Sequence, residues 1–451
     1  MKTIARYEII GFLGRGGMSK VYKVKLPFIK KIAALKCFEP SQRLISLIGL
    51  DKLRELFISE ASIISNLRHP NIIDIYFFEE IDSVLYYLME YFCHNLGVMM
   101  GETYWADARS RMIPFTQATE YILQILEGLC RLHHAGIVHR DIKPFNIMLT
   151  DTNKIKIADF GLSKLRGEQI QLPDQIKVGT AMYAAPEQIE SPDHVDFSAD
   201  LYSVGMIYYR MLTGFLPDKN RVLPSQVNRD LNTDLDYFLL KSIDSNSKSR
   251  FQTASEMKNV LLHLYNHWVD TSKQHCALQT EDNLLRMDIS KEQQQIRSSP
   301  LKLDSTEARD MFGLDELWRP QVWTQNHFKN QSNGTVVDKT TGLIWQYAGS
   351  DYTVTYSEAE IYIIQLNQIQ FAGYKHWRLP TVNELLTLLT PVPHGDDFCI
   401  EPVFSPEQKW LWSSDYKSFK SVWFVNMQMG FVSWHDIMGF YYAKAVCDDS
   451  I

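Results

Sequence analysis

Apolar and polar residues follow two different periods in the first part of the chain. Residues 7–25 and 84–93 alternate as strands do, and glycines divide 7–25 into two strands around a turn. Apolar residues recur at helical spacing in 53–67 and again in 116–134. Two apolar runs within 147–158, separated by turn-forming residues, predict a hairpin. The pattern thus predicts strands and helices in alternation, with a hairpin after the second helix.

The last part of the chain, residues 320–451, mixes strand-like runs with two amphipathic helices. The helices are expected to begin at two capping boxes, Ser357–Glu360 and Thr381–Glu384. Eight of the ten tryptophans lie within 318–434, which indicates a compact core of aromatic side chains. The strand-like runs are 334–345, 409–413, 422–427, 431–434 and 441–446. These patterns predict a small α+β domain.

A polar stretch separates the two patterned regions. Residues 270–319 contain few aromatics, which is typical of a tether, partly helical, rather than of a domain. At 451 residues the chain is also too long for one ordinary core. We therefore predict a domain over 7–268, a polar linker over 269–319 and a second domain over 320–451.

The overall composition is that of a globular protein, with 45% apolar and 22% charged residues. The net charge of −7 and the lack of a long Lys/Arg run argue against binding to nucleic acid or to an anionic membrane. The N-terminus lacks the apolar segment of a signal peptide, and no run is long enough to cross a bilayer, so a cytoplasmic location is expected. Six scattered cysteines without Cys-x-x-Cys spacing predict neither a zinc site nor a disulfide framework.

The segment His139–Asn146, together with Asp159, carries the residue types that phosphoryl transfer needs. Asp141 is placed to take a proton from a hydroxyl group, while oxygens of Asn146 and Asp159 can bind magnesium. Lys143, two residues after Asp141, can meet the transferring phosphate. Either motif alone would usually be an ordinary loop, but the two stand in the right order and spacing around the hairpin.

Both motifs resemble the catalytic loop and the magnesium motif of Hanks-type, eukaryotic-like protein kinases. The resemblance implies that Lys36 binds the nucleotide phosphates and that Glu60 pairs with Lys36 and holds it there. A glycine cluster alone is more often a hairpin turn, and Ser19 stands where the family has its third glycine. The glycines that would approach the phosphates are Gly14, Gly16 and Gly17.

The resemblance also implies an adenine pocket and a bilobal kinase fold over residues 7–268. Asp200 would brace the catalytic loop, and Arg250 would form a buried bridge with Glu187. Lys143, with Thr180 near the acceptor, implies Ser/Thr rather than Tyr acceptors. The pocket residues implied are Val21, Ala34, Met89, Met148 and the backbone from Glu90 to Phe92.

Arg140, directly before Asp141, is the arginine that grips a phosphate on the activation loop in many relatives. Here residues 164–179 contain no Ser, Thr or Tyr, and only Ser163 and Thr180 flank the stretch. We therefore hypothesise that a fixed acid, Glu168 or Asp174, balances Arg140 and that activity does not depend on phosphorylation of the loop.

Motifs in 334–345, in 377–384 and around Trp412 resemble the Lcl C-terminal domain, a bacterial family related to the C-type-lectin and formylglycine-generating-enzyme folds. The resemblance implies a recognition module for a protein or a small ligand. Cys399 and Cys447 could pair only outside a reducing cytoplasm. Residues with side chains suited to a metal, although more commonly found in solvated loops, are His394, Asp396, Asp397, Glu401, His435 and Asp436.

These features bear on functions from three classes. We predict a Ser/Thr protein kinase that uses ATP and Mg²⁺, transfers the γ-phosphate to a protein hydroxyl and carries a C-terminal recognition domain. The alternative is a nucleotide-binding scaffold, similar to a pseudokinase, whose main role is binding through the second domain. The intact set of Lys36, Asp141, Asn146 and Asp159 argues against that alternative. A lectin-like adhesin would need export, which the N-terminus does not supply.

Overall fold

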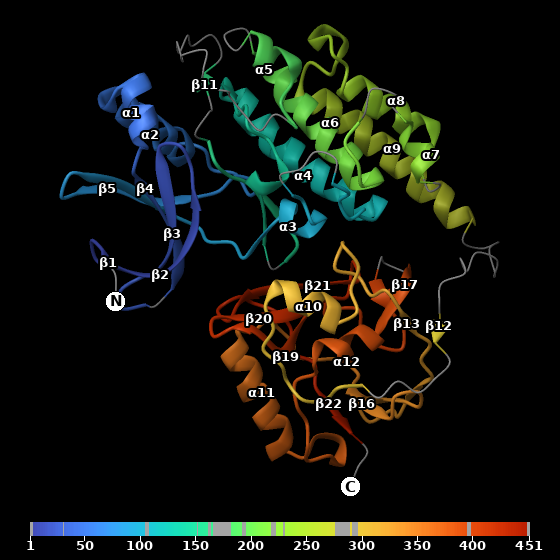
Figure 1. The fold of residues 1–451 in the computed structure, drawn as a ribbon. Helices are drawn as coiled ribbons and strands as arrows, with labels where there is room; N and C mark the ends of the chain where they lie inside the picture. Colours follow the sequence, from blue (N-terminus) through green and yellow to red (C-terminus); the bar gives the residue numbers. More distant parts are fainter. Residues whose placement is uncertain are drawn as a thin grey trace. The chain divides into compact units, whose positions relative to one another are not determined.

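The chain folds into two compact units, residues 1–278 and 279–451 (Figure 1). The structure is a computed structural model. The residues that it describes are 3–29, 31–103, 108–150, 152–160, 164–165, 182–191, 195–217, 222–228, 231–275, 289–290, 296–394 and 398–448.

The first unit begins with an antiparallel sheet of six strands in the order β1-β2-β3-β4-β6-β5, with helix α2 packed beside it. Alternation along β3 and β6 sends one set of apolar side chains into a small core that contains Val24, Leu35 and Tyr86. Strand β4 lies between β3 and β6, and its residues from Ala33 to Cys37 are buried. The elements are β1 (Thr3–Ile4), β2 (Tyr7–Arg15), β3 (Ser19–Lys25), β4 (Ile32–Phe38), α1 (Gln42–Ile48), α2 (Leu50–Ser65), β5 (Ile75–Ile81) and β6 (Val84–Met89).

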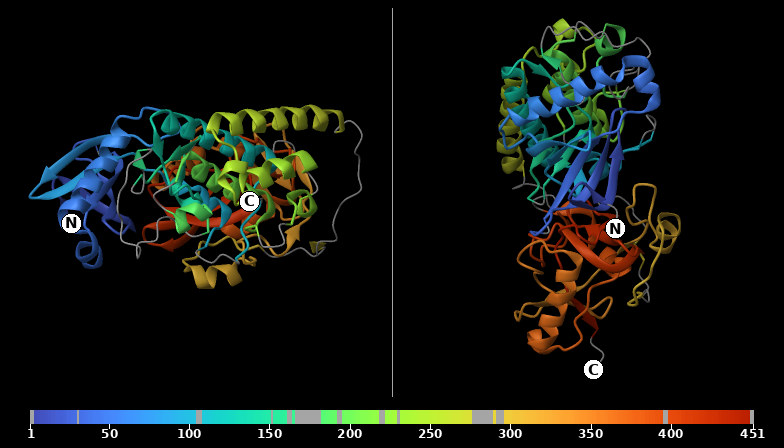
Figure 2. Two further views of the ribbon diagram at one scale, coloured as in Figure 1. Left: turned by 90° about the horizontal axis from the view of Figure 1, so that it is seen from above. Right: turned by 90° about the vertical axis from the view of Figure 1, so that its left-hand side faces the viewer.

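The rest of the first unit is mainly helical and surrounds helix α6, which is buried over nearly its whole length. Gly205 lets α6 approach α8, because a side-chain carbon there would lie 2.6 Å from Ser242 Cβ. Figure 2 shows the sheet with its helices (blue) and these helices (green) as two lobes. The helices are α3 (Leu96–Met100), α4 (Phe115–His134), α5 (Pro186–Glu190), α6 (Phe197–Thr213), α7 (Pro224–Val227), α8 (Thr233–Ser242) and α9 (Ala254–His275).

Short strands of the first unit flank the segments around Asp141 and Asp159. The predicted hairpin is present, with β9 and β10 paired antiparallel and β7 added beside β9. Ile157 N donates to Asn71 O, which ties the hairpin to the chain that enters β5. The strands are β7 (His94–Asn95), β8 (Ile137–Val138), β9 (Ile147–Leu149), β10 (Ile155–Ile157) and β11 (Lys164–Leu165).

The second unit is the α+β domain that the sequence predicts, built around buried tryptophans. A four-stranded sheet, β14-β15-β16-β22, and a three-stranded sheet, β19-β20-β21, enclose Trp345 and Trp423, both fully buried. The elements are β12 (Ile289–Ser290), α10 (Ser305–Met311), β13 (Trp323–Thr324), β14 (Phe328–Asn330), β15 (Thr335–Asp338), β16 (Leu343–Gln346), α11 (Tyr356–Gln368), α12 (Val382–Thr387), β17 (Leu389–His394), β18 (Phe398–Ile400), β19 (Trp410–Ser418), β20 (Ser421–Asn426), β21 (Phe431–Asp436) and β22 (Val446–Asp448).

The predicted linker over 269–319 differs from the structure at both ends. Helix α9 continues to His275, and residues from 296 onward belong to the second unit. Phe312 and Leu314 lie in the core of that unit. Arg297 is fastened to Asp415 by two hydrogen bonds of 2.8 Å. The stretch has the composition of a tether because its few apolar residues are spread out, yet Phe312 and Leu314 are buried among distant residues of the unit.

Two further details of the second unit correct the sequence analysis. Helix α11 is capped by Thr355 and Glu358, two residues before the predicted box, whereas the Thr381–Glu384 box is confirmed. The predicted final strand over 441–446 makes mostly isolated bridges, and β22 begins at Val446. Cys399 and Cys447 are both buried, and no disulfide joins them.

Lys444 is a buried amine in the second unit with no carboxylate partner among the described residues. It is 1% exposed, and its Nζ donates to the carbonyl oxygens of Gln346, Tyr347 and Ala348. Burial lowers the pKa of Lys444 from 10.5 to about 7. The unfolded chain therefore binds a proton that the folded chain releases, at pH values between these two.

We expect Lys444 to contribute a rise in the free energy of unfolding of the wild type between about pH 7 and 10, because the unfolded state binds the extra proton there. Lys444→Met has no titratable group at this position, so its rise over the same range should be smaller. Urea unfolding of the full chain at several pH values measures both slopes. Parallel slopes would show that Lys444 does not titrate in this range.

Candidate active site

A buried lysine–glutamate pair links the sheet to helix α2. Lys36 lies in the middle of β4 and Glu60 on the side of α2 that packs against the sheet. Lys36 Nζ lies 2.6 Å from Glu60 Oε1 and 3.1 Å from Asp159 Oδ1. Tyr87, opposite Lys36 on β6, donates its hydroxyl to the same Glu60 oxygen at 2.9 Å. The pair implied by the family resemblance is therefore present, and Asp159 joins it.

The pKa values of these groups depend on one another. Burial alone would lower the pKa of Lys36, but the carboxylates of Asp159 and Glu60 raise it well above its ordinary value. Lys36 holds the pKa of Asp159 at about 2, with a smaller contribution from Lys143. Because this lies below the ordinary value of 3.8, the stabilisation is present above pH 3.8 and is lost as the pH falls through about 2. Asp159 is therefore an anion at neutral pH.

Asp141 is oriented by two neighbours in the loop that follows β8. Asp141 Oδ2 accepts hydrogen bonds from Lys143 Nζ at 2.7 Å and from Asn146 Nδ2 at 2.9 Å. The other oxygen, Oδ1, is buried and has no hydrogen-bond partner among the described residues. An oriented carboxylate with an unused oxygen suits proton transfer from a hydroxyl group. Asn146 uses its nitrogen for this contact, so its amide oxygen can face a cation.

The backbone of this loop is bound by the carboxylate of Asp200, as the family resemblance implies. Asp200 accepts hydrogen bonds from His139 N at 2.9 Å and Arg140 N at 2.8 Å, and its carboxylate also contacts His133. Gln188 of α5 donates to Arg140 O at 2.8 Å. Arg140 has a φ of 68°, a strained conformation for a residue with a side chain. The surrounding hydrogen bonds hold the loop in that conformation.

Asp159 is positioned by the β9–β10 hairpin before it and by the ring of Phe160 directly after it. Ala158 N donates to Asn146 O at 2.9 Å, which joins the end of the hairpin to the loop of Asp141. Asp159 itself has a φ of 64°, and the Phe160 ring packs 4.8 Å from the ring of His139. The structure therefore brings the two predicted segments into direct contact, although Asp159 lies 13 positions after Asn146.

The residues expected around adenine lie in both lobes. Ala34 pairs with Met89 across β4 and β6, and Val21 of β3 lies opposite Lys36. The connection from Glu90 to Phe92 is half-buried, and the carboxylate of Glu90 binds Lys156 of β10 at 2.8 Å. Met148 is half-buried on β9, in the helical lobe.

The glycine-rich turn joins β2 to β3 and is closed by a hydrogen bond from Gly16 N to Ser19 O. Ser19, at the family's third glycine position, is buried. Gly14 would have open space around a side-chain carbon, whereas one on Gly17 would lie 2.8 Å from Leu44 of α1. A side chain at position 17 would therefore require the Leu44 side chain to shift.

The bridge between Arg250 and Glu187 is confirmed, with two hydrogen bonds of 2.7 and 2.8 Å. The side chain of Arg250 is fully buried. The hypothesis that Glu168 or Asp174 balances Arg140 lies outside the described residues, as do Ser163 and Thr180.

Sequence reasoning missed three residues that support the site: Tyr87, His133 and Gln188. The pairing of β4 with β6 could have indicated Tyr87, because a residue opposite Lys36 on the neighbouring strand must lie beside it. His133 and Gln188 reach their partners from positions 67 and 48 residues away, so no local pattern marks them.

The described residues also bear on the metal ligands considered in the second domain and on membrane-spanning helices. Within the part of the chain that the structure describes, no three His, Cys, Asp or Glu side chains gather as metal ligands would. Asp396 and Asp397 lie outside that part. The helices described there are also too short or too polar to cross a membrane.

Two family models match this chain. The model described as the protein kinase domain matches residues 7–298, and the one described as the Lcl C-terminal domain matches residues 334–447. The first match begins in β2 and covers the site described above.

Curated relatives match the same region. A probable serine/threonine-protein kinase of Clostridium perfringens is 27% identical over 267 residues, which cover 56% of this chain and 37% of the relative. Serine/threonine-protein kinase PknB of Mycobacterium leprae is 31% identical over 280 residues, 58% of this chain and 43% of the relative. Aurora kinase of Debaryomyces hansenii is 34% identical over 278 residues, 60% of this chain and 64% of the relative. The chain thus spans less than two thirds of each.

Proposed function

Because the chain belongs to the protein kinase family over residues 7–298, we propose that it transfers the γ-phosphate of ATP to Ser or Thr hydroxyls of a protein. The observation that carries the proposal is the network around Asp159. Its carboxylate binds Lys36 and is acted on by the charge of Lys143, which itself binds Asp141. A base, two cations and a carboxylate are thereby gathered in one place, as phosphoryl transfer requires.

The residues present fit magnesium-bound ATP. Asp159 is an anion with a half-exposed carboxylate, and the amide oxygen of Asn146 faces away from Asp141, so these two would hold the metal. Bound magnesium would neutralise charge on the phosphates, and ATP would supply the phosphoryl group. Lys36, fixed by Glu60, would bind phosphate oxygens, with Gly14, Gly16 and Gly17 lining the approach. Val21, Ala34, Met89, Met148 and the backbone of Glu90 and Phe92 would enclose adenine.

The role of each group in the acceptor's reaction follows from its contacts. Asp141 would accept the hydroxyl proton at Oδ1, because Oδ2 is already bonded to Lys143 and Asn146. Lys143, 21% exposed at its side chain, can reach both Asp141 and a phosphoryl oxygen. The hydrogen bonds among these groups fix their positions, so little reorganisation opposes the reaction.

The test is phosphate transfer by the full chain with radiolabelled ATP and a general acceptor protein, followed by phosphoamino-acid analysis. We expect label on Ser and Thr, and loss of transfer when a chelator removes magnesium. A chain that binds a fluorescent ATP analogue but transfers no phosphate would instead be the nucleotide-binding scaffold. Label on Tyr alone would overturn the choice of acceptor.

The second domain is proposed to be a recognition module with a C-type-lectin-like fold, which captures a protein or a small ligand. Its support is the match to the Lcl C-terminal domain and the aromatic core between two sheets. A cytoplasmic location is part of the proposal because ATP is an intracellular substrate. No disulfide joins the five cysteines among the described residues, which fits a reducing compartment.

A further inference from the structure

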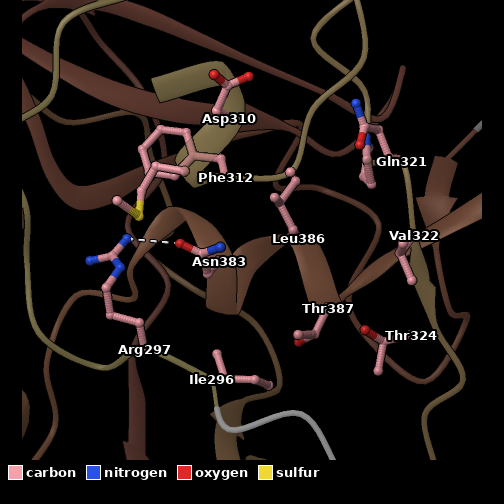
Figure 3. A pocket seen from close by; sticks show the side chains of 13 residues that line it. Ile296, Arg297, Asp310, Phe312, Gln321, Val322, Thr324, Asn383, Leu386 and Thr387 are labelled. Atoms are coloured by element: carbon pink, nitrogen blue, oxygen red, sulfur yellow. Dashed lines mark hydrogen bonds between the residues drawn. The ribbon is translucent and has the colours of Figure 1, made fainter. Parts of the chain in front are cut away.

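A cavity of about 350 Å³ opens on the second unit, within the size range of ligand sites (Figure 3). Four separate segments line it: the strap at 296–297, the end of α10 with the turn after it (310–313), the segment 320–324 and helix α12 from Asn383 to Thr387. Phe312 and Thr387 in its wall are buried, so the cavity is built on the core of the unit.

The cavity carries no uncompensated charge toward its centre. Arg297 is the cation in its wall, and both terminal nitrogens of the guanidinium lie 2.8 Å from oxygens of Asp415, which is fully buried. In Figure 3 the carboxylate of Asp310 points away from Asn383 and Leu386. A charged ligand group would lose its hydration here without gaining a partner of opposite charge. The charges therefore favour an uncharged ligand.

The polar groups of the wall include both a donor and acceptors. Asn383 Oδ1 accepts a hydrogen bond from Arg297 at 2.9 Å, so its NH₂ group lies on the side of Leu386 (Figure 3). Gln321 donates its Nε2 to Leu314 O at 3.0 Å, which leaves its Oε1 as an acceptor. A peptide group, which has one N–H and one C=O, can satisfy a donor and an acceptor of this kind together.

The rest of the lining is apolar and partly exposed. Met311 is 54% exposed and Val322 47%, and Ile296 and Leu386 are half-buried. Apolar surface gathered beside fixed polar groups is the usual lining of a ligand site. An apolar side chain placed between Val322 and Leu386 would cover this surface.

We propose that this cavity binds an extended, uncharged segment of a partner protein. An apolar side chain of the segment lies against Val322 and Leu386, and the flanking main-chain amides bond to Asn383 and Gln321. The inference deepens the proposed recognition role of the second domain and depends on that role. It is independent of phosphate transfer, because no residue of the site in the first unit takes part.

The test is ligand-observed NMR with the full chain and three tripeptides. Acetyl-Ala-Leu-Ala-methylamide is uncharged, acetyl-Ala-Ala-Ala-methylamide lacks the large apolar side chain, and acetyl-Asp-Leu-Asp-methylamide adds negative charge. We expect the first to bind in the millimolar range and the other two at least about tenfold more weakly. No binding of the first, or equal binding of all three, overturns the proposal, whether or not the chain transfers phosphate.

Two variants and a control place the binding in the cavity. Val322→Glu puts a charge at an exposed apolar position, and Asn383→Asp keeps the acceptor for Arg297 while removing the donor. Each should weaken binding of the Leu peptide about tenfold or more. Ile361→Glu, at a 53% exposed isoleucine of α11, is the matched control and should leave binding unchanged. Unchanged binding in both cavity variants would exclude this site, provided their thermal unfolding matches the wild type.

Discussion

Asp141→Asn is expected to lower the rate constant for phosphate transfer about 10²- to 10⁴-fold, the usual contribution of a general base. The amide oxygen of asparagine can still accept hydrogen bonds from Lys143 and Asn146, so the loop should keep its shape. What is lost is the basic oxygen at the position of Oδ1, which is buried and without a partner among the described residues. Single-turnover transfer of radiolabelled phosphate measures the loss.

Affinity for ATP separates this effect from damage to the fold. Binding of a fluorescent ATP analogue to Asp141→Asn should stay within about threefold of the wild type, because Asp141 contacts neither Lys36 nor Glu60 in the described hydrogen bonds. Asp74→Asn, at a half-exposed carboxylate 3.8 Å from Lys156, is the matched control and should retain full activity. Transfer by Asp141→Asn within a few-fold of the wild type would remove the base from the mechanism.

Lys36→Met is expected to lower phosphate transfer about 10²- to 10³-fold, because it removes a preorganised charge from the phosphate site. It should also destabilise the fold. Glu60 would remain buried with its charge uncompensated, and breaking a buried pair in this way costs about 3–5 kcal/mol. Its pKa, already raised by burial, would rise further as the carboxyl group takes up a proton.

A double variant distinguishes the two losses. Glu60→Gln added to Lys36→Met removes the orphaned carboxylate, and its amide oxygen can still accept the hydrogen bond from Tyr87. We expect thermal unfolding to return most of the way to the wild type while phosphate transfer stays low. Recovery of activity together with stability would mean that Lys36 serves the fold alone.

Local patterns in the sequence were enough for the elements that carry the site. The β9–β10 hairpin, the glycine turn before Ser19 and the Thr381–Glu384 cap depend on residues a few positions apart, so their chemistry is visible in the chain itself. The order of the motifs identified both families, and the matches to the protein kinase and Lcl C-terminal domains confirm them.

The boundary of the second unit could not be predicted in the same way. Residues 296–319 are polar in composition, but Arg297 meets Asp415, 118 positions later, and Phe312 packs edge-on against Trp423. Burial of that kind depends on which distant residues come close, and composition averaged along the chain does not record it. The cap of α11 lies two residues before the predicted one. Thr355–Glu358 has the same spacing as the predicted box, so spacing alone did not distinguish the two.

The sequence by itself determined which chemical groups the protein has and in what order they occur, because residue identity and short-range periodicity are properties of the chain. Only the tertiary structure decided how those groups act on each other. Lys36 and Asp159, 123 residues apart, come within 3.1 Å, and this contact acts to raise the pKa of Lys36 and to lower the pKa of Asp159. The physical reason is that burial and Coulomb interaction depend on distance in space, which separation along the chain does not specify.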